Sequence, residues 1–79
     1  MYWVYVLESD NHHRYTGHTG HLFKRIIKHK SGQAFWTKRH KNWQLIYLEM
    51  FKTRAEAIKR EKELKSGKGR DELKRKGII

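Results

Sequence analysis

Apolar and aromatic side chains occur along this chain in short runs, separated by polar and basic segments. Three runs are rich in β-branched and aromatic types, which favour extended backbone. They occupy residues 2–8, 14–18 and 45–51. The first is apolar at successive positions, so we expect a strand that is buried on both faces. The polar segment 9–13 lies between the first two runs and predicts a β-hairpin.

Segments that have the residue pattern of helices follow the second and the third of these runs. We expect three helices, over residues 22–30, 54–65 and about 70–76. Thr19 is a suitable N-cap for the first helix. Thr53 and Glu56 have the spacing of a capping box, which predicts the start of the second helix. The second helix should end at Ser66-Gly67, because glycine is favoured just beyond a helix C-terminus.

The length of 79 residues predicts a single domain over residues 1–79 with a small core. The chain has no cysteine, which excludes disulfides and thiolate zinc sites. No apolar stretch approaches the roughly 20 residues that a membrane span needs. The first seven residues lack the basic leader and cleavage site of a signal peptide. We therefore expect a cytoplasmic protein that does not act on membranes, and we assume a monomer.

The charge balance points to an anionic partner. Lysine and arginine number 19 against 8 acidic residues, which gives a net charge of +11. Such an excess is typical of proteins that bind nucleic acid, so we expect DNA, with RNA as an alternative. The alternative explanation of the positive charge is a basic surface that only keeps the protein soluble. The cations placed to contact phosphates are Lys24, Lys28, Lys38, Arg39 and Lys41; the last three lie beside aromatic residues, as in grooves that stack bases.

Two tyrosines, ten residues apart, lie in the first two predicted strands. If Leu7 pairs with Tyr15, then Tyr5 pairs with Gly17 and both tyrosines share one face. A shift of one residue would send them to opposite faces, and the sequence does not decide between the registers. A side chain at Gly17 would crowd the approach of Tyr5 or of a phosphate. Alone, each tyrosine would be read as a core residue.

Glu61 falls within the apolar arc of the second helix, between Ala57, Ile58 and Leu64. A buried carboxylate is costly unless it is paired or binds a metal ion. The alternatives are therefore metal ligation, an ion pair with Arg25 or a lysine, or a side chain that bends out to water.

Arg25 and His29 lie one turn apart at the rim of the first helix. Arg25 could bind a phosphate and offset charge as it develops, or be an ordinary surface arginine. His29 could orient a tyrosine or move a proton, or lie on the surface. A nearby arginine and a divalent metal would lower the pKa of a tyrosine. One tyrosine could then take a proton from an attacking water.

The order and spacing of these groups resemble the GIY-YIG nuclease family, in particular its small stand-alone bacterial members and the catalytic domain found in excinucleases. The matching positions are Trp3-Val4-Tyr5, Tyr15-Thr16-Gly17, Arg25, His29 and the segment 56–65 with Glu61. Trp3 stands where the first glycine of the motif is expected. No asparagine follows Asn42, whereas many family nucleases have one near the site.

The resemblance implies an α+β fold, with a three-stranded antiparallel sheet flanked by helices. It implies one divalent metal ion, Mg²⁺ or Mn²⁺, bound by Glu61 with waters completing the shell. Tyr5 or Tyr15 would activate water, Arg25 would bind the phosphate and His29 would assist. The expected activity is metal-dependent DNA endonuclease, by nicking or structure-specific cleavage. The alternative is a non-catalytic module that binds nucleic acid through the same scaffold.

Overall fold

The computed structural model describes residues 1–10, 12–30 and 42–79, without the side chains of residues 29 and 30. The predicted three strands and three helices are present. In chain order they are β1 (Tyr2–Glu8), β2 (Arg14–Thr19), α1 (Leu22–Lys30), β3 (Gln44–Phe51), α2 (Arg54–Lys65) and α3 (Gly67–Arg75). The last helix begins three residues earlier than expected, because the Ser66 side chain caps it by accepting a hydrogen bond from the Gly69 N–H.

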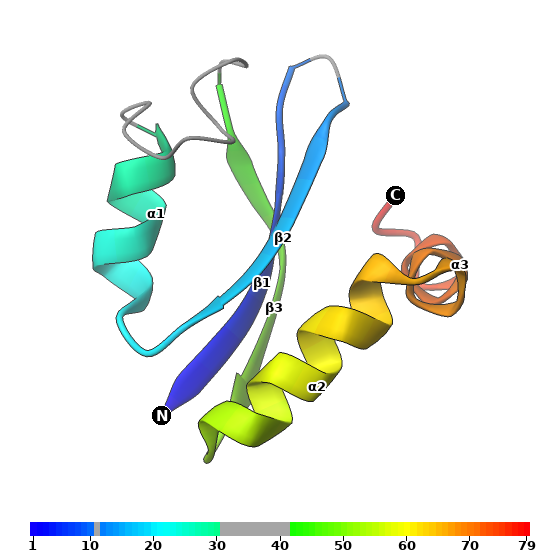
Figure 1. Cartoon of the computed structure of the whole chain (residues 1–79). Helices are drawn as coiled ribbons and strands as arrows, with labels where there is room; N and C mark the ends of the chain where they lie inside the picture. The colour runs from blue at the N-terminus through cyan, green and yellow to red at the C-terminus, as the bar shows by residue number, and fades with distance from the viewer. Residues whose placement is uncertain (11, 31–41) are drawn as a thin grey trace.

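The strands form one antiparallel sheet in the order β2-β1-β3. Helix α1 lies on one side of the sheet, and α2 and α3 lie on the other (Figure 1). This confirms the predicted fold class. The central strand β1 is buried from Val4 to Leu7, as its continuous apolar run predicted. Because the strand order is β2-β1-β3, β2 is an edge strand, and only one of its sides pairs with another strand of the sheet.

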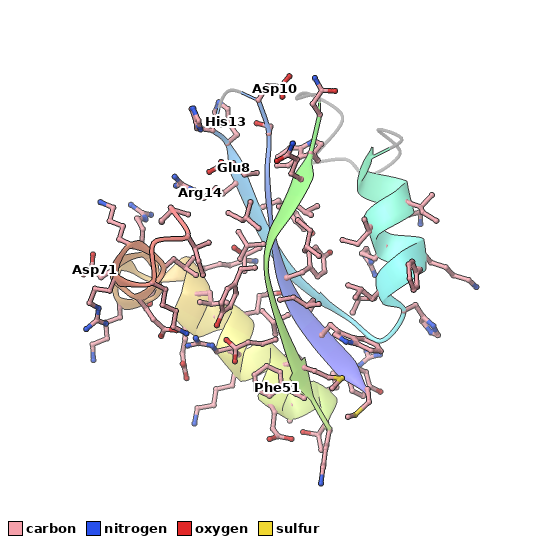
Figure 2. All side chains as sticks on the ribbon, turned by 180° about the vertical axis from the view of Figure 1, so that it is seen from behind. Glu8, Asp10, His13, Arg14, Phe51 and Asp71 are labelled. Carbon is pink, nitrogen blue, oxygen red and sulfur yellow. The ribbon has the colours of Figure 1, made fainter. Side chains whose placement is uncertain are left out.

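The β1–β2 register is the one that puts both tyrosines on one face. Leu7 pairs with Tyr15 and Tyr5 pairs with Gly17. Beyond these pairs, Arg14 Nε donates to Glu8 Oε2 at 3.1 Å, near the turn of the hairpin (Figure 2). In this register Tyr15 packs against the cluster of Tyr5 and Leu7, and a shift of one residue would exchange the two faces of β2.

Alternate residues of β1 enter two separate cores. Val4 and Val6 face α2 and α3, where they belong to a cluster with Ala57, Leu64 and Leu73. On the α1 side, the second cluster consists of Tyr5, Leu7 and Trp43, with Tyr15, Leu22 and Ile26 packed against it. The two faces of the sheet therefore carry different groups to the β2 edge.

Only half of the large apolar residues of α1 are packed against the sheet. Leu22 and Ile26, four positions apart, contact the core. Phe23 and Ile27 lie on the neighbouring line of the helix surface and are 84% and 64% exposed. A nine-residue helix lying on a sheet buries a narrow stripe, so residues about 100° around its axis face away from the contact.

The helix caps were predicted with mixed success. The capping box is present, with Glu56 N–H donating to Thr53 Oγ1 at 3.2 Å and Thr53 N–H donating to Glu56 Oε1 at 3.3 Å. Thr19, in contrast, is the last residue of β2, and its hydroxyl accepts from the His21 N–H at 3.0 Å. It therefore supports the bend that leads into α1, with two residues between it and the helix.

An ion-pair network holds α3 against α2 and β3. Arg60 Nε donates to Glu49 Oε1 at 2.6 Å, and Arg60 also pairs with Glu63 and Glu72. The Lys76 ammonium lies 3.1 Å from Glu72 Oε2. None of the helices in the described part of the chain has the length and apolarity to cross a membrane.

Candidate active site

The two tyrosines lie together over a glycine of the edge strand. Tyr5 is fully buried, and its ring centroid lies 6.2 Å from that of Tyr15, with 31° between the ring planes. A Cβ atom at Gly17 would lie 2.8 Å from Tyr5 Oη and 3.0 Å from Tyr15 Cε1. The Tyr5 phenol therefore crosses β2 at the only type of residue that leaves room for it.

Three of the predicted site residues influence the pKa of Tyr5. Burial raises the pKa of Tyr5 well above its usual value, and the neighbouring Tyr15 and the Glu61 carboxylate raise it further. The Arg25 guanidinium acts on this pKa in the opposite direction. As predicted, the arginine lowers the pKa of the tyrosine, but burial raises this pKa by more, so Tyr5 stays protonated at neutral pH.

Glu61 lies on α2 with 17% of its side chain exposed. Its Oε1 is 2.8 Å from His18 Nδ1, and its Oε2 accepts a hydrogen bond from Lys65 Nζ at 3.2 Å. An ion pair with a lysine was one alternative predicted from the sequence, and the pair with Lys65 is of this kind.

No pattern in the sequence pointed to His18. It lies on the face of β2 opposite the tyrosines, where it meets α2, and 43 positions separate it from Glu61. No local spacing rule connects a strand and a helix that far apart. The alternation of β2 places His18 on the same side as Val4, its partner in the β1 register. That signal becomes useful only once α2 is known to cover this face.

The basic candidates are divided between described and undescribed parts of the chain. Lys24, Arg25 and Lys28 are exposed on α1. His29 belongs to the last turn of α1, but its side chain is outside the described residues. The three remaining predicted phosphate contacts also lie outside the described residues; they are Lys38, Arg39 and Lys41.

The groups that could hold a metal ion are few. Within residues 1–10, 12–30 and 42–79, no three His, Cys, Asp or Glu side chains form a metal-binding group. Glu61 and His18 together provide one carboxylate and one imidazole. A set this small fits a divalent ion that keeps several of its own water ligands, as Mg²⁺ does. It does not fit a closed structural zinc site, which needs four protein ligands.

A cleft of about 670 Å³ runs along the first half of β2, between that strand and the end of α2. Its basic residues are His13, Arg14, Lys65 and Arg70, and its apolar residues are Val6, Trp43, Leu64, Leu73 and Ile79. Tyr15 and Thr16 also line it. Because Lys65 contacts Glu61, the cleft adjoins the candidate metal site.

Residues 1–75 match the GIY-YIG catalytic domain, and the chain belongs to this family. Within it, the chain is similar to small bacterial proteins of the UPF0213 group. A UPF0213 protein of Staphylococcus saprophyticus is 42% identical over 74 residues, which cover 92% of this chain and 90% of the relative. Another, from Staphylococcus epidermidis, is 35% identical over 74 residues, with the same coverage.

A solved structure also matches. The solution NMR structure of a UPF0213 protein from Bacillus halodurans is 34% identical and superposes with a TM-score of 0.57. The match covers 92% of this chain and 82% of that one. The family predicted from the motifs is thus confirmed, and membership of a catalytic-domain family implies a nuclease that acts on nucleic acid with a divalent metal.

Proposed function

We propose that this protein is a metal-dependent endonuclease that hydrolyses phosphodiester bonds in DNA. The observation that carries the proposal is the pair of phenols packed over Gly17 at the β2 edge, in a chain whose residues 1–75 match the GIY-YIG catalytic domain. The charges of Arg25 and Glu61 both act on the Tyr5 phenol. A phenol, a guanidinium and a carboxylate are the groups needed to move a proton, bind a phosphate and hold a metal ion. One such site cuts one strand at a time, so nicking or structure-specific cleavage is the expected outcome.

In this proposal Tyr15 first loses its own proton to solvent, and its phenolate then accepts the proton of the attacking water. Burial holds Tyr5 in its protonated form, which leaves Tyr15 as the phenol that can take up a proton. Tyr15 is also less buried than Tyr5. Arg25 binds the scissile phosphate and offsets the charge that develops on it. His29, one turn further along α1, assists the transfer of the proton.

Glu61 holds the divalent ion, Mg²⁺ or Mn²⁺. When bound, the ion supplies positive charge that stabilises the leaving oxygen. Glu61 must first release Lys65, whose side chain is 54% exposed and can turn into solvent. The freed ammonium is then available to a DNA phosphate in the adjoining cleft.

The basic groups on both sides of the β2 edge support a path for DNA across it. Arg25 lies on the α1 side of the sheet, and Lys65 and Arg70 lie in the cleft on the α2 side. With roughly 4–6 phosphate contacts, log K for binding should fall with log[salt] at a slope of about −4 to −5. Lys24 and Lys28, exposed on α1, extend this path. Lys38, Arg39 and Lys41 stay predicted phosphate contacts outside the described residues.

The test compares two glutamates of the same helix. Purified protein is incubated with single-stranded, flapped and branched DNA, in Mg²⁺ or Mn²⁺ and in chelator. We expect cleavage that chelator abolishes and that Glu61→Gln lowers at least about 100-fold, since the metal ligand is lost. Glu63→Gln, at a side chain that is 51% exposed and pairs with Arg60, should leave the rate unchanged. Binding to DNA should be retained in both variants.

The rival function is a non-catalytic module that binds nucleic acid. It predicts salt-sensitive binding with no cleavage of any substrate in either metal. Cleavage that survives unchanged in Glu61→Gln would refute the metal site proposed here, even if the protein proved to be a nuclease.

A further inference from the structure

The imidazole beside the candidate metal ligand has no part in the mechanism proposed above. His18 Nδ1 lies 2.8 Å from Glu61 Oε1, and the two side chains are 28% and 17% exposed. His18 comes from the edge strand and Glu61 from the helix packed across it, so the fold itself brings them together. Because both side chains are partly buried, water competes only weakly for the imidazole nitrogen and the carboxylate oxygens.

The two partners of Glu61 differ in how firmly they are held. Lys65 is a long side chain on the same helix, 54% exposed, and it can leave without any change in the backbone. His18 belongs to β2 and is paired with Val4 of the central strand. When the lysine leaves, the imidazole therefore remains at the carboxylate.

The distance between the donor atoms suits joint ligation. Neighbouring ligands at right angles lie about 3 Å apart when each bond to the metal is about 2.1 Å long. The separation of 2.8 Å between His18 Nδ1 and Glu61 Oε1 is close to this value. In the neutral imidazole tautomer with its proton on Nε2, the Nδ1 lone pair is available for the metal.

We propose that His18 Nδ1 is a second protein ligand of the metal ion held by Glu61. This inference rests on the proposed function and deepens it, because it identifies the class of metal. An imidazole adds affinity for first-row transition ions such as Mn²⁺ and Co²⁺ and adds little for Mg²⁺. The site should therefore bind Mn²⁺ more tightly than Mg²⁺. Two protein ligands leave the other positions open to water and to a substrate phosphate.

The test uses Mn²⁺ bound to the full chain without DNA, so its main result does not depend on cleavage. Pulsed electron paramagnetic resonance detects the ¹⁴N nucleus of a ligating imidazole. We expect ¹⁴N modulation in the native protein and its loss in His18→Ala and His18→Gln. His21→Ala, at an exposed histidine three residues away, should keep it. The Mn²⁺ affinity should fall about 10–100-fold in the His18 variants, and Mg²⁺ affinity should change far less.

The glutamine variant separates ligation from positioning. Its side-chain amide can still donate a hydrogen bond to Glu61, so a histidine that only orients the carboxylate would be replaced with little loss of Mn²⁺ affinity. That result, or Mn²⁺ binding that requires Glu61 without any ¹⁴N modulation, would overturn the assignment of His18 and leave the proposed nuclease intact.

A different result would count against the function itself. If Glu61→Gln binds Mn²⁺ as tightly as the native protein and cuts DNA equally well, the metal is not held by Glu61, and both proposals fail. Circular dichroism spectra and melting curves of all variants identify any loss that comes from unfolding.

Discussion

The substitution Gly17→Ala tests the position of the Tyr5 phenol most directly. The new methyl group would lie 2.8 Å from Tyr5 Oη and 3.0 Å from both Tyr5 Cζ and Tyr15 Cε1. Ordinary contacts of a Cβ atom begin at 3.4 Å, so the closest approach is 0.6 Å too short. Two aromatic rings must therefore move, or the edge strand must shift away from β1.

The loss of stability in Gly17→Ala depends on how far the Tyr5 ring can move. Its side chain is fully buried, so the ring cannot turn into solvent to relieve the overlap. Overpacking of this kind destabilises proteins by about 1–3 kcal/mol. The loss of glycine entropy from the unfolded chain offsets about 0.4–1 kcal/mol of this. A net cost of about 1–2 kcal/mol would lower the melting temperature by about 4–16 °C in a domain of this size.

Thermal unfolding followed by circular dichroism measures this shift. The matched control is Gly67→Ala, because nothing lies within 4 Å of its new Cβ atom. This control should melt at or slightly above the native temperature. Gly17→Ala should also cut DNA more slowly at temperatures where it is fully folded, since both phenols are displaced. If the two variants melt together at the native temperature, the phenol does not cross the strand at Gly17 and the reasoning is wrong.

Three further predictions concern other parts of the fold. Arg60 holds the pKa of Glu72 down, from 4.5 to about 2, so the stability that this carboxylate contributes is complete above pH 4.5 and is lost as pH falls toward 2. Denaturant unfolding across that range should show a shallower acid loss in Glu72→Gln than in the native protein; an equal loss in both would contradict this. Absorbance titration of the phenols should show one tyrosine ionising above the others, because burial raises the pKa of Tyr5, and Tyr5→Phe should remove that late step. Gly69→Ala should lower the melting temperature more than the strand substitution, because its Cβ would collide with backbone of α2 that cannot rotate away; an equal or smaller loss would contradict this.

The local elements of this protein follow from the sequence because their causes are local. The capping box of Thr53 and Glu56 starts α2 where it was predicted. A threonine and a glutamate three residues apart supply side-chain hydrogen bonds to the backbone N–H groups at the start of the helix, and this depends only on their spacing. The continuous apolar run of β1 predicted burial on both faces. The motifs also identified the family, because the spacing of the tyrosines, arginine and glutamate is a property of the chain alone.

Tertiary structure decided which of those residues meet. The hairpin loop left two registers open, and the one with Tyr5 over Gly17 is the register in which Tyr15 packs against the cluster of Tyr5 and Leu7. The sheet order placed β2 at an edge. The Tyr5 phenol, which crosses β2, therefore lies beside Tyr15 and is not covered by a further strand of the sheet. The contact between His18 and Glu61 joins a strand and a helix 43 residues apart, and no pattern along the chain encodes such a distance. Local rules act over a few residues of backbone, whereas a site assembled from separate elements depends on how their buried faces pack against each other.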